Sequence, residues 1–300
     1  MLHIDYYLSH PNELAVSLLQ HGGAWLPDRT FLKWLYRLKM GRKLDLDRPK
    51  RYTEKLQWLK LYDRKPAYAA MVDKVAVKEY VADMIGKEYV IPTLGVWEKP
   101  EEIDWEGLPD KFVLKTAHGG GGTSVLICDD KSHFDRRRAV RMLSEHMKDN
   151  VYRSYREWPY KHVPHRILAE QLLEKDCQYK DIPDFKFYCF NGEPKVLLVA
   201  TNRFTSHNFN YYDMDFHKMQ ITSSFGERSE TAFGKPLHFE KMKEIAARLS
   251  RGIPHLRVDM YYTNGKVFFG ELTFFDGSGF DNNSSDTIDL EWGSWISLPV

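Results

Sequence analysis

The chain has 300 residues, 43% of them hydrophobic and 14% aromatic, which is enough for a sizeable core that we expect to be divided between two lobes. Its 43 Lys and Arg residues nearly equal its 42 Asp and Glu residues, so no overall electrostatic field would attract nucleic acid or an anionic membrane surface. Asp5 and His10 interrupt the first apolar stretch, and no later segment approaches the ~20 apolar residues that span a bilayer. We therefore expect a cytoplasmic protein without a nucleic-acid partner or stable membrane insertion.

Residues 1–65 are predicted to form a helical N-terminal segment. Three stretches have helical periodicity: NELAVSLLQ, RTFLKWLYRLKM and YTEKLQWLKLY. Gly41 would end the second helix. Thr53 could cap the third helix, with Glu54 in its first turn.

Residues 66–168 are predicted to form a first lobe. An apolar face from Tyr68 to Ile85 indicates one further helix, which would carry Lys74 and end at Gly86. Two strand-like runs follow, KFVLKT and TSVLICD, separated by the glycine-rich AHGGGG. A helix is expected from Phe134 to Lys148.

Residues 169–300 are predicted to form a second lobe around a largely antiparallel sheet. RILAEQLLE, DFKFYCF, PKVLLVA and NFNYYDM are typical of successive strands, with a hairpin signal at Asn191 and Gly192. PLHFEKMKEIAARLSRG predicts a helix, and HLRVDMYY and KVFFGELTFF predict a last pair of strands. The polar stretch from Asp281 to Asp289 is expected to be a surface loop.

Asp259 and Glu271 lie on the last two predicted strands, whose alternation can direct both carboxylates to one side. Two like charges that face each other need a cation. Mg²⁺ prefers hard oxygen ligands and is usually held by one or two carboxylates together with substrate phosphates. Two solvent-exposed strand carboxylates are the alternative.

The glycine run in AHGGGGTS is the second candidate feature. It would let several backbone N–H groups approach phosphate oxygens, and Lys115, just upstream, would add a positive charge. A mobile hairpin tip has the same composition. The run is not a Walker P-loop, because no GK[ST] follows it.

The order of Lys74, Lys115, the ILAEQLLE segment, Asp259 and Glu271 resembles the ATP-grasp superfamily over about residues 73–279. Five segments resemble the TupA-like ATP-grasp family more closely: YTEKLQWLKLYDR, MVDKVAVKEYV, KFVLKTAHGGGG, DFKFYCFNG and RVDMYYTNGKVFFGELTFFDGSGF. The resemblance covers nearly the whole chain. It implies an α+β ATP-grasp fold, in which two lobes with largely antiparallel sheets clamp ATP behind a helical N-terminal segment.

The resemblance also implies which residues bind ATP. Lys74 and Lys115 would contact the phosphates. The flexible phosphate lid would consist of Gly119, Gly120, Gly121 and Gly122. The hinge that meets adenine would consist of Glu170, Gln171 and Leu172. Asp184 lies where related enzymes keep an acidic residue for the ribose, with Glu174 and Asp176 as competitors.

Asp259 and Glu271 correspond to the family's metal ligands. The third ligand position, commonly Asn in the superfamily, is Thr273 here, which leaves the number of Mg²⁺ ions open. Arg257 precedes Asp259 by one strand period and could stabilise the transferred phosphoryl group, or could form a cross-strand ion pair. Ser278, in DGSGF, could lie near the reacting groups or in a simple turn.

The implied activity is that of an ADP-forming carboxylate–amine ligase, which uses ATP and Mg²⁺ to make an acyl phosphate that an amine attacks. TupA-like proteins are associated with cell-surface polysaccharide or peptide-polymer synthesis, so the expected partners are an amino acid or amine and a carboxylate-bearing glycan such as a uronic-acid polymer. Arg203 and His207 are candidates for recognising an acidic glycan, with a loop salt bridge as the alternative.

Three alternatives remain open on sequence. A kinase that phosphorylates a glycan would use the same ATP site. A glycosyltransferase could use the Asp213-x-Asp215 pair, although the helical N-terminus argues against its usual fold. An ATP-binding regulator without turnover is conceivable because of Thr273.

Overall fold

The N-terminal helices are those that the periodicity predicts. In the computed structural model the described residues are 11–119, 124–176, 181–201, 208–221, 227–228, 233–280 and 285–299. The first helices are α2 (Pro11–Gly22), α3 (Asp28–Met40) and α4 (Tyr52–Tyr62), with a short turn η1 (Gly23–Trp25). Gly41, at φ +67°, ends α3 as expected. The prediction that Thr53 caps α4 is wrong: Arg51 occupies the cap, and its N–H donates to Glu54 at 3.1 Å. Thr53 already lies inside the first turn.

The single helix expected from Tyr68 to Ile85 is two helices, α5 (Ala67–Val72) and α6 (Val77–Ile85). The break lies at Asp73, whose carboxylate accepts a hydrogen bond from the Val75 N–H at 2.9 Å. A side chain that competes for backbone N–H groups interrupts a helix in this way. Lys74 therefore lies in the turn between the helices and not on a helix.

A four-stranded antiparallel sheet has the order β1-β4-β2-β3. Its strands are β1 (Thr93–Trp97), β2 (Phe112–Thr116), β3 (Val125–Cys128) and β4 (Ile167–Gln171). The hairpin of β2 and β3 is confirmed, whereas β1 was not anticipated. The lobe boundary expected after residue 168 falls inside β4. Helices α7 (Arg136–His146) and α8 (Val151–Tyr155) and the turns η2 (Lys87–Tyr89), η3 (Pro100–Glu102), η4 (Lys131–His133) and η5 (Trp158–His162) complete this part of the chain.

A six-stranded sheet has the order β10-β9-β5-β6-β7-β8 and is antiparallel except between β7 and β8. Its strands are β5 (Asp184–Phe190), β6 (Glu193–Thr201), β7 (Asn208–Tyr212), β8 (Glu227–Arg228), β9 (His255–Thr263) and β10 (Lys266–Thr273). Helix α9 (Phe239–Leu249) packs on β5, β6 and β9. The expected apolar face of α9 is confirmed, since all five of its residues are buried: Phe239, Met242, Ile245, Ala246 and Leu249.

The last helix, α10 (Asp286–Trp295), replaces part of the expected surface loop. Residues 281–284 lie outside the described residues, but Ser285 caps this helix, and Asp289 is buried, with only 4% of its surface exposed. Asp289 accepts hydrogen bonds from the Thr53 N–H at 2.9 Å and from its hydroxyl at 3.0 Å. The prediction of a surface loop was wrong because acidic residues are usually exposed, whereas Asp289 is buried and joins α10 to α4.

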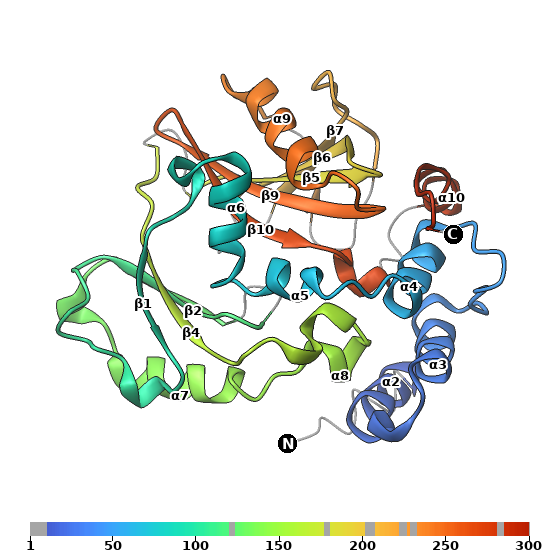
Figure 1. Cartoon of the computed structure of the whole chain (residues 1–300), viewed down its shortest axis with the longest axis horizontal. Coiled ribbons are helices and arrows are strands. Elements are labelled where there is room, and N and C mark those ends of the chain that lie inside the picture. Colours follow the sequence, from blue (N-terminus) through green and yellow to red (C-terminus); the bar gives the residue numbers. More distant parts are fainter. Residues whose placement is uncertain are drawn as a thin grey trace.

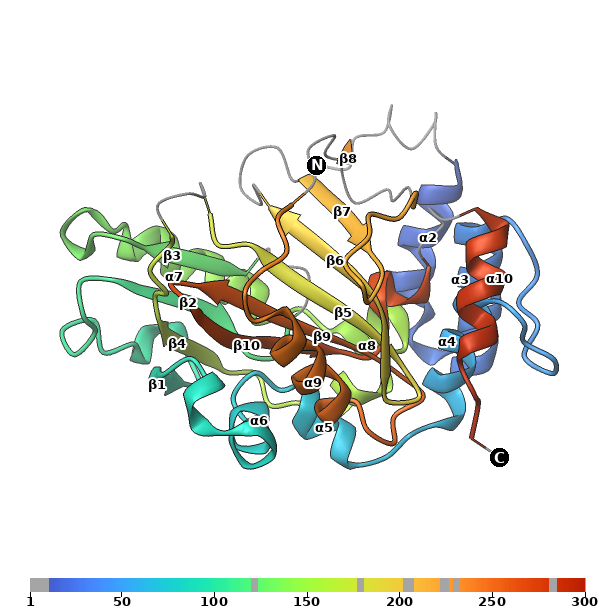
Figure 2. The ribbon, with the colours of Figure 1, turned by 90° about the horizontal axis from the view of Figure 1, so that it is seen from above.

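Figures 1 and 2 show the four-stranded sheet and α7 at one end of the molecule and the N-terminal helices with α10 at the other. Helices α5 and α6 contribute Met71, Val72 and Val81 to the same apolar core as the six-stranded sheet. The short turn η6 (Asp276–Gly279) follows β10 and contacts α4. None of the described helices is long and apolar enough to cross a membrane.

Candidate active site

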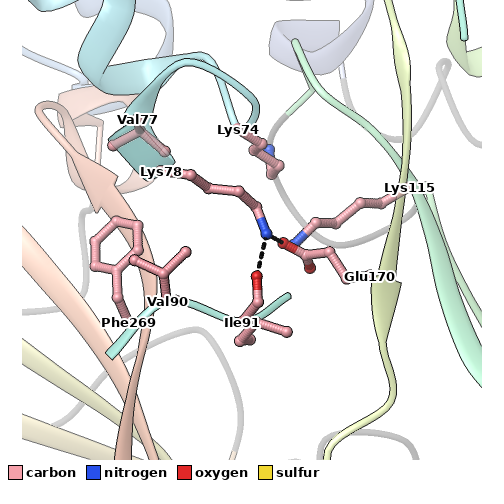
Figure 3. Close-up of a pocket in the computed structure, with 9 residues that line it drawn as sticks. Lys74, Val77, Lys78, Val90, Ile91, Lys115, Glu170 and Phe269 are labelled. Atoms are coloured by element: carbon pink, nitrogen blue, oxygen red, sulfur yellow. Dashed lines mark hydrogen bonds and ion pairs between the residues drawn. The ribbon is translucent and has the colours of Figure 1, made fainter. Parts of the chain in front are cut away.

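A pocket lies where α6, the four-stranded sheet and β10 meet (Figure 3). Its polar side chains are three lysines and one carboxylate: Lys74, Lys78, Lys115 and Glu170. Its other lining residues are Val77, Val90, Ile91, Phe269 and Gly270. The predicted residues Lys74, Lys115 and Glu170 are thus brought together, and Lys78 joins them.

The antiparallel register of β2 and β4 explains how Lys115 reaches Glu170. Val113 is the direct partner of Glu170, and Lys115, two residues further along β2, lies on the same face as Val113. The Lys115 ammonium pairs with Oε2 of Glu170, while Lys78 Nζ lies 2.6 Å from Oε1. Lys74 Nζ donates to the carbonyl of Gly119. Each carboxylate oxygen of Glu170 therefore has its own lysine.

The pocket carries an excess of positive charge. Burial lowers the pKa of Lys74 and of Lys78, although nearby carboxylates oppose the shift. Burial alone would raise the pKa of Glu170, but Lys115 and Lys78 together hold it below its ordinary value. A phosphate chain would bring the negative charge that this group of lysines lacks.

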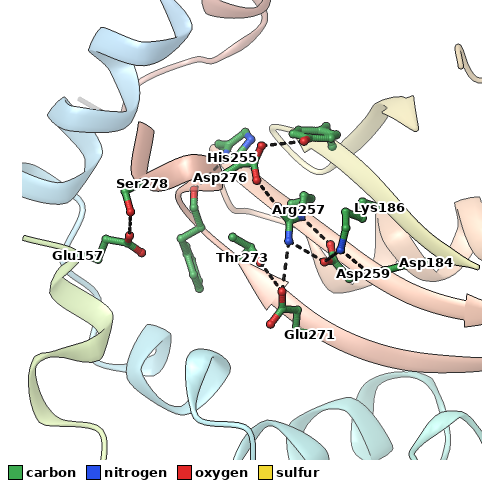
Figure 4. Close-up of polar contacts among 12 residues, drawn as sticks. Glu157, Asp184, Lys186, His255, Arg257, Asp259, Glu271, Thr273, Asp276 and Ser278 are labelled. Atoms are coloured by element: carbon green, nitrogen blue, oxygen red, sulfur yellow. Dashed lines mark hydrogen bonds and ion pairs between the residues drawn. The ribbon is translucent and has the colours of Figure 1, made fainter. Parts of the chain in front are cut away.

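Carboxylates gather on the neighbouring strands β9, β10 and β5 (Figure 4). The register places Glu271 opposite Asp259 and Thr273 opposite Arg257, as the alternation predicted. The Arg257 guanidinium binds both oxygens of Asp259, at 2.7 Å and 2.6 Å, and its Nη2 lies 3.2 Å from Glu271. Arg257 also pairs with Asp276. The cross-strand ion pair, weighed as the alternative for Arg257, is therefore formed in this structure.

Asp184 belongs to the same network through Lys186. The Lys186 ammonium lies 2.5 Å from Asp184 Oδ2 and 2.6 Å from Asp259 Oδ2. Burial alone would raise the pKa of Asp259, but Arg257 and Lys186 hold it at about 2. Lys186 was not a predicted site residue, although its position one strand period after Asp184 is a signal that alternation provides.

The donor set can be tested for its fit to Mg²⁺. Four carboxylates share the two cations Arg257 and Lys186: Asp184, Asp259, Glu271 and Asp276. This excess of hard, negatively charged oxygens suits a divalent cation. In the described part of the chain, however, no group of three or more Asp, Glu, His or Cys side chains is arranged to hold a metal ion. Asp259 and Glu271 can therefore be two ligands, and substrate phosphates would have to supply others.

The lysine pocket (Lys74, Lys78, Lys115 and Glu170) and the carboxylate network (Asp184, Asp259, Glu271 and Asp276) are close enough for their charges to interact. Glu271 is the strongest of the carboxylates that oppose the lowering of the Lys74 pKa. Phe269 and Gly270, which line the pocket, directly precede Glu271. Tyr160, which sequence reasoning missed, faces the same region: burial raises its pKa, and Glu157 and Glu271 raise it further.

Ser278 lies in the turn η6, which packs against α4. Gly277, Ser278 and Gly279 have φ values of +51°, +55° and +66°. The Ser278 hydroxyl donates to Glu157 at 2.6 Å (Figure 4), and its carbonyl accepts from Lys60 at 2.7 Å. Neither Glu157 nor Lys60 was predicted, because both come from segments far from Ser278 in the sequence.

The remaining predicted residues have varied positions. Gln171 is exposed and Leu172 half-buried at the end of β4. The Glu174 side chain is exposed, while its carbonyl accepts from Thr263 at 2.6 Å; Asp176 is half-buried. Thr273 Oγ1 lies 3.5 Å from Glu271 Oε1. Five predicted residues lie outside the described residues: Gly120, Gly121, Gly122, Arg203 and His207.

Asp213 shapes a turn at the end of β7. Its Oδ1 accepts the backbone N–H groups of Asp215 at 3.0 Å and His217 at 2.8 Å. Its Oδ2 lies 3.2 Å from the His217 ring. The Asp213 carboxylate therefore makes local hydrogen bonds to the backbone of the kind that Asp makes in turns.

A model of the TupA-like ATP-grasp family matches residues 54–297 of the chain, and no curated protein matches it. Among solved structures, the chain is similar to D-alanine–D-alanine ligase from Helicobacter pylori, with 11% identity over 83% of this chain and 70% of that one and a TM-score of 0.44. It is also similar to D-cycloserine synthetase DcsG, with 14% identity over 76% and 70% and a TM-score of 0.45. The ATP-grasp ligase PsnB, in a complex with Mg and ADP, has 13% identity over 81% and 66% and a TM-score of 0.43. Resemblances this distant carry no argument about substrate.

Proposed function

The chain belongs to the TupA-like ATP-grasp family, and on that premise we propose that it is an ATP- and Mg²⁺-dependent carboxylate–amine ligase that acts through an acyl phosphate. One observation supports this proposal above all. The lysine pocket around Glu170 adjoins the carboxylate network of Asp259 and Glu271. Such a site has cations for a polyphosphate and carboxylates for its metal.

In the proposed reaction, a substrate carboxylate attacks the γ-phosphorus of ATP and ADP leaves. An amine then attacks the acyl carbon, phosphate leaves, and an amide remains. Lys74 and Lys115 would hold phosphate oxygens and compensate their charge. Mg²⁺ held by Asp259 and Glu271, with Thr273 nearby, would supply further charge stabilisation.

Arg257 and Lys186 would keep Asp259 ionised and correctly oriented, because they occupy both of its oxygens. For Arg257 to stabilise the transferred phosphoryl group as well, part of its guanidinium would have to leave these carboxylates. Glu170 to Leu172 would line the adenine side of the site, Gly119 to Gly122 would form the phosphate lid, and Asp184 would meet the ribose. Ser278 would lie on the side of the acceptor.

For the substrates we infer an amino acid or amine and a carboxylate-bearing glycan or polymer, and we place the reaction in the cytosol, where ATP is available. This part of the proposal rests on the family's association with surface polymers. Arg203 and His207 stay candidates for glycan recognition.

The decisive experiment incubates the protein with Mg²⁺-ATP, uronic-acid glycans and a pool of amino acids, and follows ADP, phosphate and product mass together. Acceptor-dependent phosphate release with a product of amide mass would support the ligase. ADP release with a phosphorylated glycan would replace it by a kinase.

Two variants test the site. Lys115→Ala and Glu271→Ala should each abolish ATP turnover while the protein stays folded, because Lys115 lines the pocket, Glu271 lies in the adjoining carboxylate network, and neither belongs to the apolar core. Lys99→Ala and Glu102→Ala are matched controls, since this pair is exposed, by 71% and 47%, and should change nothing. Turnover near the wild-type rate in either site variant would contradict the assignment.

A further inference from the structure

The Lys78–Glu170 ion pair connects the two sheets of the molecule. Lys78 lies on α6, whose Val77 and Val81 belong to the core of the six-stranded sheet, whereas Glu170 lies on β4 of the four-stranded sheet. The Lys78 ammonium also donates to the Ile91 carbonyl at 2.6 Å. The Lys78 side chain is 13% exposed and that of Glu170 6%, so the pair is largely withdrawn from water.

Glu170 forms ion pairs with two lysines, Lys78 and Lys115, and we assign these lysines different roles. Lys115 pairs with one oxygen and is also a proposed phosphate-binding residue. A phosphate group that binds Lys115 competes with Glu170 for the same positive charge. A buried carboxylate that loses a cation without compensation is costly, so a second cation at Glu170 would lower the cost of this exchange.

We propose that Lys78 is a positioning residue for nucleotide binding: by neutralising Glu170 it leaves Lys115 available for the phosphate chain. The inference rests on the proposed ATP site and adds a residue to which neither the family resemblance nor the sequence pattern assigns a role. Lys78 itself need not touch the nucleotide.

The pH dependence of binding separates this role from a merely structural one. The charged groups that face Glu170 are Lys78 from α6, Lys115 from β2 and Lys74 from the turn before α6. With Lys78 neutral, ionised Glu170 would hold Lys115 more tightly, and burial would act on the Glu170 pKa with less opposition. As the pH falls, Glu170 would then take up a proton and release Lys115.

The experiment measures the affinity for Mg²⁺-ATP of the wild type and of Lys78→Gln from about pH 8 to about pH 6. Glutamine retains a donor for the Ile91 carbonyl but lacks the charge. We expect Lys78→Gln to bind ATP about tenfold more weakly at pH 8, which corresponds to roughly one pKa unit of lost charge interaction. The deficit relative to the wild type should shrink as the pH falls, because titration of the nucleotide is common to both proteins.

Three further variants complete the test. Lys78→Gln combined with Glu170→Gln should bind ATP to within about threefold of Glu170→Gln alone, because no carboxylate then competes for Lys115 and the Lys78 charge has nothing to neutralise. Lys87→Met removes the same charge from the exposed segment just after α6 and should not alter binding. Thermal unfolding of each variant shows whether it is folded. If Lys78→Gln is unfolded, the comparison of the double variant with Glu170→Gln takes its place: the two should bind ATP equally well.

The outcomes are distinct. A Lys78→Gln variant that binds ATP like the wild type would overturn the inference. So would a Lys78→Gln deficit that is the same at every pH, together with a double variant that binds ATP more weakly than Glu170→Gln alone, because Lys78 would then contact the nucleotide or only support the fold. A folded wild-type protein that does not bind ATP would instead remove the proposed function, and the inference with it.

Discussion

The Lys60 ammonium lies 2.7 Å from the carbonyl oxygen of Ser278. This contact joins helix α4 of the N-terminal segment to the turn that follows the last strand of the six-stranded sheet. Lys60 has no exposed surface, and its ammonium lies 4.7 Å from the centre of the Phe280 ring. Burial lowers the pKa of Lys60 to about 7, although the charge of Glu157 opposes the shift. The N-terminal helices therefore form part of the support of the candidate site.

This burial predicts a pH-dependent stability. Between about pH 7 and the ordinary Lys value of ~10.4 the unfolded chain binds a proton at Lys60 that the folded protein lacks, so the contribution of Lys60 to stability rises with pH. We expect the wild type to gain stability relative to Lys60→Met from pH 7 to pH 9 in urea unfolding. A constant difference over this range would show that Lys60 stays protonated in the folded protein.

Arg257 should be among the most costly residues to replace. Arg257→Met leaves Asp259, Glu271 and Asp276 without their shared cation, and the loss of one partner from a buried ion pair typically costs about 3 to 5 kcal/mol. Chemical denaturation at pH 7 measures this cost. Added Mg²⁺ should stabilise the variant more than the wild type, because the freed carboxylates are then available to the ion.

Lys195→Met is the matched control for Arg257→Met. It breaks an ion pair with Glu193, whose side chain is 69% exposed, and exposed pairs contribute only about 0 to 1 kcal/mol. If the two variants lost similar amounts of stability, the proposed importance of the buried network would be refuted.

His118 predicts a loss of stability in acid. Its ring stacks on that of His165, with the ring centres 3.8 Å apart, and burial together with the charge of His165 lowers the His118 pKa to about 4. Below the ordinary His value of ~6.5 the unfolded chain takes up a proton that the folded protein resists, so stability falls as the pH drops through this range. His118→Phe keeps an aromatic ring and should lose less stability than the wild type between pH 6.5 and pH 4.5 in thermal unfolding. Equal slopes would exclude this role for His118.

Asp213→Ala distinguishes the ligase from a glycosyltransferase. Loss of the hydrogen bonds to the Asp215 and His217 N–H groups should cost about 1 kcal/mol of stability and leave Mg²⁺-ATP binding unchanged. Isothermal titration with ATP and urea unfolding measure the two effects. Loss of ATP binding by a folded variant would contradict the site described above.

Periodicity along the chain was sufficient to find most helices and strands of the fold. It also placed Asp259 and Glu271 on adjacent strands, and the register confirms that they face each other. These predictions succeed because strand alternation and helical repeats depend only on residues that are close together in the sequence. The break at Asp73 was missed because a side chain that bonds to the backbone leaves the apolar repeat unchanged.

By itself, then, the sequence determined the main elements, the family resemblance and the residue types of the candidate site. Only the tertiary structure decided the partners: Lys78 with Glu170, Lys186 with Asp259 and Lys60 with Ser278. It also decided that Arg257 binds three carboxylates. The physical reason is that a buried charged group is stable only beside an oppositely charged or hydrogen-bonding partner. Which partner lies close enough depends on packing, which brings together segments that lie far apart in the sequence.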